Sequence, residues 1–290
     1  MIPASFDYHA PATLPEALAL LAQYGDTAKV LSGGQSLLPL LKLRLGAADH
    51  LIDIGKIPGL EYIREEGGML KIGARTREAA LEDSELIRSK YPILFDTAKV
   101  IADPLVRNRA TVGGNLAHGD PGNDHPATML ALGARVVAVG KKGERTIAID
   151  DFFVGVFATA LAPDEILTEV RIPSPPPRSG GAYVKLERKV GDYATAAAAV
   201  QVTLSAAGTV ERIGIGLTNL GPMPIHARDA EKLITGKKPD AAAIAAVAAA
   251  AAKQTAPNAD RRGAVEYKRE MARVLCGRAL AKALERAGGR

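Results

Sequence analysis

Two short segments, far apart in the chain, combine residue types that can bind phosphate. The first, Ser32-Gly33-Gly34-Gln35-Ser36, follows a short apolar strand and precedes an apolar run compatible with a helix. Successive glycines can adopt positive φ angles and let a ligand approach the backbone, so that several N–H groups converge on an anion. A tight strand–helix connection without any function would show the same spacing, so this segment alone leaves both interpretations open.

The second segment is Thr111-Val112-Gly113-Gly114-Asn115, and polar residues follow it as far as His125. Two Gly-Gly turns could clamp the phosphates of a dinucleotide from both sides. Neither turn has the G-x-G-x-x-G spacing of a Rossmann fold, and Gly214-Ile215-Gly216 is followed by Asn219 where the third glycine would stand. The G-x-x-x-x-G-K-[ST] spacing is absent as well. We therefore expect a dinucleotide bound without a Rossmann fold.

The polar run after the second segment contains possible metal ligands, namely His118, Asp120, Asp124 and His125. Pro121-Gly122 predicts a loop there, without the i, i+4 spacing of ligands on one helix face, so we expect loop capping and cofactor contacts instead of a metal. Neither a serine nor the single cysteine, Cys276, lies in a nucleophile elbow. We therefore predict no hydrolytic centre and no catalytic residue in this chain.

The composition indicates a chain of two ordinary domains. It has 290 residues, of which 47% are hydrophobic and 24% charged, and no apolar run approaches the roughly 18 residues of a membrane span. The start of the chain lacks the pattern of a signal peptide, so we expect a cytoplasmic protein without a transmembrane segment. One cysteine cannot hold an iron–sulfur cluster. The net charge of +5 is spread along the chain, and no Trp is present, so nucleic acid is not an expected partner.

The order of predicted elements begins with a helix capped by Thr13-Leu14-Pro15-Glu16 and ending at Gly25. Helices are also predicted from near Thr76 and after Pro92. Apolar and β-branched runs bounded by turn residues predict strands at 29–31, 51–54, 62–63, 69–72, 135–139 and 146–149, and one ending at 172.

The segment 173–181 contains four prolines and two glycines, which predicts an extended linker and a boundary between domains 1–177 and 178–290. After it we predict strands at 182–186, 196–204 and 213–217. An Ala-rich helix over 241–252 and a last helix reaching about Leu284 complete a small sheet with packed helices. In this domain Tyr193 is either a core residue or a platform for a ring, and the composition alone favours the core.

Together, segment 32–36 with the following Leu-Leu-Pro and Lys42-Leu43-Arg44, and segment 106–115, resemble the two flavin-binding segments of the medium subunit of molybdenum hydroxylases. Residues 120–124 and 191–198 resemble the carbon monoxide dehydrogenase branch in particular. The similarity runs from about Ser5 to the final helix. It implies an α+β protein: a PCMH-type (VAO-like) FAD-binding domain, followed by a small α/β carbon monoxide dehydrogenase flavoprotein C-terminal domain with an antiparallel sheet.

The resemblance also implies FAD as the cofactor, held without a covalent bond because no His or Cys lies where the ring is placed. Both Gly-Gly turns would bind the pyrophosphate through backbone N–H groups. Asp124 would contact the ribityl or phosphate side, Lys185 would lie near the O4 and N5 edge of the flavin, and Tyr193 would cover one face. The role of Gln35, where relatives often have His, is unassigned. The implied FAD contacts are Ser32, Gly33, Gly34, Gln35, Ser36, Thr111, Val112, Gly113, Gly114, Asn115, Asp124, Lys185 and Tyr193.

Such a subunit would work with a large molybdenum-pyranopterin subunit and a small [2Fe-2S] subunit, in a dimer of heterotrimers. Electrons would pass from the clusters through FAD to an external acceptor such as a quinone, in the cytoplasm or at the inner face of the membrane. Three alternatives stay open. They are the flavin subunit of a hydroxylase acting on an N-heterocycle or an aldehyde, a stand-alone FAD oxidoreductase, and a non-catalytic nucleotide-binding module.

Overall fold

The computed structural model describes residues 2–288, which form the predicted α+β protein. The chain begins with a parallel sheet of order β1-β3-β2, formed by β1 (Asp7–His9), β2 (Ala28–Leu31) and β3 (His50–Asp53). Helix α1 (Leu14–Tyr24) packs on it, and Thr13 Oγ1 accepts the Glu16 N–H at its start, as predicted. The 3-10 helix η1 (Gly25–Thr27) leads into β2, and α2 (Leu37–Leu43) follows the first glycine segment.

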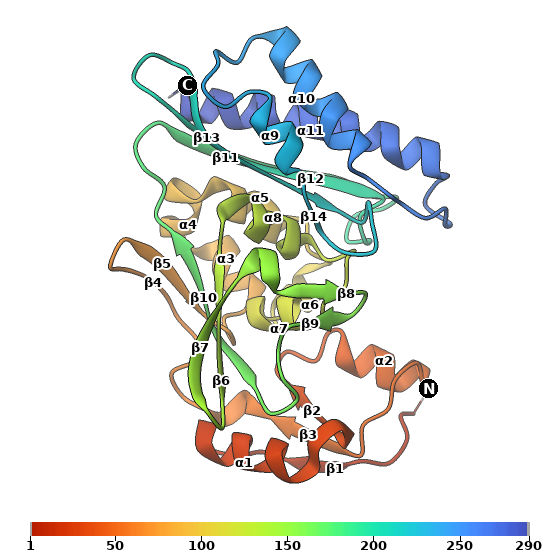
Figure 1. The fold of residues 1–290 in the computed structure, drawn as a ribbon. Coiled ribbons are helices and arrows are strands. Elements are labelled where there is room, and N and C mark those ends of the chain that lie inside the picture. Colours follow the sequence, from red (N-terminus) through yellow and green to blue (C-terminus); the bar gives the residue numbers. More distant parts are fainter. Residues whose placement is uncertain (1, 289–290) are drawn as a thin grey trace.

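The second layer is a five-stranded antiparallel sheet of order β4-β5-β10-β6-β7 (Figure 1). Its strands are β4 (Ile63–Glu66), β5 (Met69–Gly73), β6 (Arg135–Gly140), β7 (Gly143–Ala148) and β10 (Ile166–Pro173). The helices that follow β5 are α3 (Glu78–Asp83), α4 (Glu85–Lys90), α5 (Pro92–Lys99), α6 (Pro104–Arg107), α7 (Val112–Ala117) and α8 (Asp124–Leu132). Apolar residues of the sheet and of these helices, apart from α6, share one core, which fixes α7 and α8 relative to the strands.

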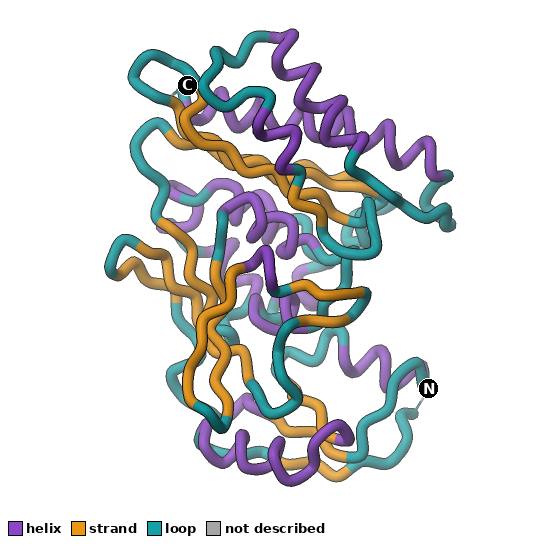
Figure 2. The backbone as a smooth tube through the Cα atoms, in the orientation of Figure 1, coloured by secondary structure: helices purple, strands orange, loops and turns teal. Residues whose placement is uncertain are grey.

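The last sheet, of order β11-β12-β13-β14, is antiparallel and covered on both faces (Figures 1 and 2). Its strands are β11 (Ser179–Leu186), β12 (Ala196–Leu204), β13 (Val210–Thr218) and β14 (Ile225–His226). Helices α9 (Arg228–Lys232), α10 (Ala241–Lys253) and α11 (Val265–Ala287) follow, with α11 packed on β11 and β12. Helix α8 packs against β13 on the other face, and a Cβ on Gly214 or Gly216 would lie 2.0 or 1.9 Å from an α8 carbonyl oxygen. These glycines therefore serve helix–sheet packing and bind no nucleotide.

The observed connection between the two domains is shorter than the linker predicted over residues 173–181. Pro173 still pairs with Met69 at the end of β10, and Gly180 and Gly181 pair within β11, which leaves residues 174–178 as the connection. Gly180 is needed because α11 passes so close that a Cβ there would lie 2.2 Å from the Ala283 carbonyl oxygen, and a Cβ on Gly181 would lie 2.1 Å from Gln201 Oε1. Proline is tolerated where a strand ends.

The predicted loop over residues 118–125 is only partly a loop, because α8 begins at Asp124 and includes His125. Pro126 stands in the first turn, where a missing N–H costs no helical hydrogen bond. The short elements β1, β8 (Phe153–Gly155), β9 (Ala158–Thr159), β14, α6 and α9 had no clear sequence signal, and neither had the short 3-10 helices η2 (Ile54–Lys56) and η3 (Ile149–Asp151). In residues 2–288, no helix has both the length and the apolar content to cross a membrane.

Candidate functional site

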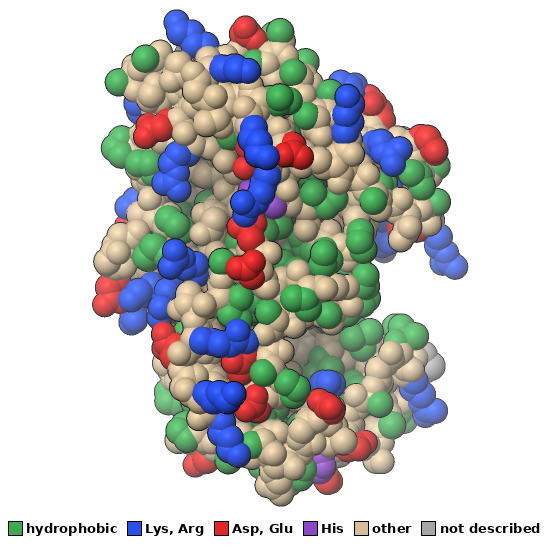
Figure 3. Space-filling model, viewed as in Figure 1, with side chains coloured by type: hydrophobic (Ala, Val, Ile, Leu, Met, Phe, Trp, Pro, Cys, Tyr) green, Lys and Arg blue, Asp and Glu red, His purple; other side chains and the backbone are tan. Residues whose placement is uncertain are grey.

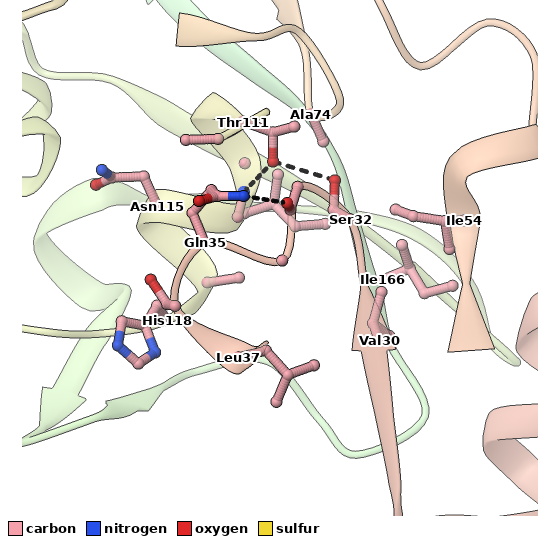
Figure 4. A pocket seen from close by; sticks show the side chains of 18 of the residues that line it. Val30, Ser32, Gln35, Leu37, Ile54, Ala74, Thr111, Asn115, His118 and Ile166 are labelled. Atoms are coloured by element: carbon pink, nitrogen blue, oxygen red, sulfur yellow. Dashed lines mark hydrogen bonds between the residues drawn. The ribbon is translucent and has the colours of Figure 1, made fainter. Parts of the chain in front are cut away.

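A cavity of about 290 Å³ lies where both glycine segments meet. In the space-filling view the molecule is hollowed on the side of α2, between the N-terminal layer and the rest of the chain (Figure 3). The cavity lining includes the following predicted residues: Ser32, Gly33, Gly34, Gln35, Ser36, Thr111, Gly113, Gly114 and Asn115. The structure thus brings together segments that are 79 positions apart at Ser32 and Thr111, whose hydroxyl oxygens lie 3.1 Å from each other (Figure 4).

The first glycine segment is a loop with free backbone donors. The N–H groups from Gly33 to Leu37 donate no hydrogen bond to another described residue. Buried or half-buried backbone donors are normally paired, so this run is available to an anionic ligand. The Gln35 side chain donates to the Gly33 carbonyl oxygen at 3.2 Å, which gives it a local structural role.

The positive φ expected for successive glycines occurs at Gly34, with φ 75°, and not at Gly33. Gly33 is required for another reason. A Cβ there would lie 2.1 Å from the carbonyl oxygen of Arg109, just before the second segment. The first segment therefore rests directly on the backbone of the second.

The second segment is the first turn of helix α7, which corrects the prediction of a turn with free N–H groups. Thr111 is the N-cap and accepts the Gly114 N–H at 3.2 Å, and the Gly113 N–H donates to Ala74 at 2.9 Å. The Val112 and Asn115 N–H groups are also engaged within the chain. Val112 is fully buried and stays outside the cavity lining.

Asn115 contributes a side chain to the cavity. Its Oδ1 atom is buried and has no hydrogen-bond partner among residues 2–288. A buried acceptor without a partner is costly, so a ligand donor at this position would satisfy it. The opposite part of the lining is apolar, with Val30, Ile54 and Ile166 facing the cavity in Figure 4. A polar strip beside an apolar end suits a nucleotide, whose base is apolar on its faces.

Asp124 and Lys185 form a buried ion pair outside this lining. Lys185 Nζ lies 3.0 Å from Asp124 Oδ2 and donates to the Val100 carbonyl oxygen at 2.8 Å. The Tyr183 hydroxyl donates to Asp124 Oδ1 at 2.6 Å. Burial raises the pKa of Asp124, while the Lys185 charge opposes that shift. Tyr183 was not predicted, since a tyrosine in a strand shows no sign of a carboxylate partner from a distant helix.

Tyr193 is not a core residue, contrary to what the composition favoured. It is 46% exposed, and its ring lies beside Gly122, where a Cβ would come within 3.2 Å of Tyr193 Cδ1. The Arg262 guanidinium lies 5.8 Å from the ring centroid. The ring therefore keeps a free surface near the loop that leads from α7 to α8.

His118 is a cavity residue that was expected only as a loop cap or cofactor contact. Burial lowers the pKa of His118, while the nearby Asp120 carboxylate opposes that shift. Its ring packs on Phe157, with 5.2 Å between the centroids. In residues 2–288, no group of three or more His, Cys, Asp or Glu side chains is placed to hold a metal ion.

Two known protein families match consecutive parts of this chain. Residues 4–175 match the FAD binding domain in molybdopterin dehydrogenase, and residues 181–283 match the CO dehydrogenase flavoprotein C-terminal domain. The chain belongs to the FAD-binding subunits of the molybdopterin dehydrogenases. The free N–H groups after Gly33 and the unpartnered Asn115 oxygen fit the FAD that this family binds.

The most similar relatives include medium chains of carbon monoxide dehydrogenase. The chain from Afipia carboxidovorans is 47% identical over 99% of both sequences, and that from Hydrogenophaga pseudoflava is 46% identical over 97% of both. The solved carbon monoxide dehydrogenase of Hydrogenophaga pseudoflava superposes with a TM-score of 0.96, at 48% identity and 99% coverage of each chain. This FAD-binding chain is therefore the flavin component of an oxidoreductase.

Proposed function

We propose that this chain is the flavin subunit of a molybdenum, iron–sulfur and flavin dehydrogenase that oxidises carbon monoxide. The observation that most supports the flavin role is the run of free N–H groups from Gly33 to Leu37, in a cavity shared with Asn115. Identity of 46–47% to carbon monoxide dehydrogenase medium chains over nearly the whole length supports the choice of branch.

In this proposal, the N–H groups of the first segment hold the FAD pyrophosphate. The Ser36 and Thr111 hydroxyls and the Asn115 Nδ2 group assist as donors, and Asn115 Oδ1 accepts from a donor group elsewhere on the cofactor. Val30, Ile54 and Ile166 form the apolar end of the site. Tyr193 covers one face of the isoalloxazine. Lys185 acts through its charge, because its ammonium group is already held by Asp124 and Val100. Bound FAD supplies the redox chemistry, and the residues of this chain orient it and limit its contact with water.

The proposed partners are a large molybdenum-pyranopterin subunit and a small [2Fe-2S] subunit in a dimer of heterotrimers. One cysteine in the whole chain cannot ligate an iron–sulfur cluster, so clusters must come from a partner. We further propose a cytoplasmic complex, peripheral at the membrane face if its acceptor is a quinone. The two domains divide at residues 177 and 178, in the connection between β10 and β11.

Purification from the native host tests this function, with identification of the bound chromophores and of the polypeptides that co-purify. We expect non-covalent FAD, released completely into the supernatant by acid precipitation, together with molybdenum-pyranopterin and [2Fe-2S] polypeptides. Carbon monoxide should then reduce the clusters and the flavin.

Three results would contradict it in different ways. Reduction by an N-heterocycle or an aldehyde, and not by carbon monoxide, would move the chain to another hydroxylase. Turnover by the isolated chain would indicate a stand-alone FAD oxidoreductase. A colourless protein would indicate a non-catalytic nucleotide-binding module.

A further inference from the structure

The hairpin of β8 and β9 carries an exposed aromatic residue in a strained conformation. Phe157, in the turn between the two strands, has a φ of 54° and is 56% exposed. A bulky side chain disfavours the left-handed region, and such strain persists at sites where the surrounding structure holds the residue for function. The exposed ring gains little from burial in this chain, so folding alone does not explain the conformation.

The surrounding structure holds Phe157 against the wall of the FAD cavity. Its N–H donates to the Gly119 carbonyl oxygen at 3.0 Å, and a Cβ on Gly119 would lie 3.1 Å from the Phe157 carbonyl carbon. The Phe157 ring packs on His118, which lines the cavity. Leu161, shortly after β9, also lines the cavity. The hairpin thus continues the cavity wall on the His118 side.

The loop 118–122, which contacts Phe157, also borders the ring of Tyr193 from the second domain. Gly122 contacts Tyr193, whereas His118 and Gly119 contact Phe157, so both exposed rings border the loop 118–122. Figure 3 shows hydrophobic side chains around the hollow in the region where Figure 1 places β8 and β9. Exposed apolar groups gathered beside a ligand cavity commonly belong to the binding site.

The size of the cavity indicates why FAD would reach this hairpin. Pockets for drug-sized ligands measure roughly 300–1,000 Å³, and the cavity of about 290 Å³ is too small to enclose a whole dinucleotide. The free N–H groups place the pyrophosphate beside the glycine loop, and the Val30, Ile54 and Ile166 side chains line one end. Because the proposed function places the flavin ring near Tyr193, which lies beside Gly122, the part of FAD outside the cavity would extend past His118.

We propose that Phe157, supported from below by His118, is a further FAD-contacting residue, forming a second aromatic wall for the part of the cofactor that extends beyond the cavity. The proposal rests on the placement of the flavin ring near Tyr193 under the proposed function. In this proposal, the strained turn holds the ring on the exposed side of the hairpin, where the cofactor could contact it.

Substitution by asparagine tests the ring without disturbing the turn, since asparagine is tolerated in the left-handed region. In the complex as purified, Phe157→Asn should raise the Kd for FAD about three- to tenfold and increase flavin fluorescence, because an aromatic contact that quenches the flavin is lost. Phe157→Tyr keeps the ring and should leave both quantities at the wild-type level. Val154→Asn, at a residue 59% exposed on β8, is the matched polarity control and should also be silent.

Wild-type Kd and fluorescence in Phe157→Asn would overturn the inference. Loss of co-purifying subunits with normal FAD binding would overturn it too, because Phe157 would then be a subunit contact. Absence of FAD from the wild-type complex would instead contradict the proposed function, so the two failures are distinguishable.

Discussion

The two glycine segments look alike in sequence and do different things in the structure. The first, 32–36, is a loop whose following N–H groups are free, whereas the second, 111–115, opens helix α7 with its N–H groups engaged. A glycine pair therefore indicates that another group comes close to the backbone. It does not indicate whether that group is a ligand or another part of the chain.

The two segments are nevertheless one site. Gly33 lies against the carbonyl oxygen of Arg109, and Gly113 lies against Ala74, where a Cβ would be 2.6 Å from the Ala74 Cβ. The second segment is thus a rigid base anchored to the five-stranded sheet, and the first rests on it. We infer that the first segment binds FAD through its backbone and the second through side chains.

The largest effect should come from Gly33→Val. The new side chain would collide with the Arg109 carbonyl oxygen, 2.1 Å from the Cβ position, and displace the N–H groups from the cavity. We expect soluble chain without FAD, measured as flavin per polypeptide. Gly46→Val is the control, since Gly46 is exposed and a Cβ there has no neighbour closer than 3.9 Å. FAD retained by Gly33→Val would contradict a backbone-mediated site.

The next effect tests the side-chain role of the second segment. Asn115→Asp places a negative charge beside the pyrophosphate and should weaken FAD binding by about 2–3 kcal/mol, or about 100-fold. Asn115→Ala, which only removes the amide, should cost about tenfold. The measurement is the Kd from FAD titration of the deflavinated protein. If both variants weakened binding equally, Asn115 would not lie close to the phosphates.

A smaller effect is expected from Thr111→Val, which removes the N-cap of α7 and the contact with Ser32. The lost cap should destabilise the chain by about 1 kcal/mol. For a domain of this size the thermal midpoint should then fall by about 2–4 °C. Thr111→Ser keeps the hydroxyl and should behave like the wild type. An unchanged midpoint in Thr111→Val would mean that α7 is held by its core contacts alone.

The smallest effect is expected from Ser36→Ala. The Ser36 hydroxyl makes no hydrogen bond at the start of α2, and the first segment contributes mainly backbone donors. We expect the Kd for FAD to rise about twofold, because one neutral hydrogen bond that is exposed to water contributes little to binding. A loss as large as that of Asn115→Ala would show that both segments bind through side chains, which would remove the contrast between them.

Much of the fold could be predicted because its signals are local. The helix capped by Thr13, the Ala-rich helix α10 and the hairpin of β4 and β5 follow from capping residues, periodicity and turn glycines a few positions apart. The family resemblance was equally readable, because both flavin-binding segments are continuous stretches of sequence.

Tertiary structure decided which groups of those segments are free. Gly33 is required by a carbonyl oxygen of a residue far along the chain, and the N–H groups of 112–115 are engaged partly by Ala74 and Thr76. The buried cluster of Tyr183, Asp124 and Lys185 also joins strand β11 to the start of helix α8, about 60 positions earlier in the chain. Contacts of this kind depend on which backbone segments the fold brings within a few ångströms of each other. Composition, periodicity and residue spacing do not determine that distance.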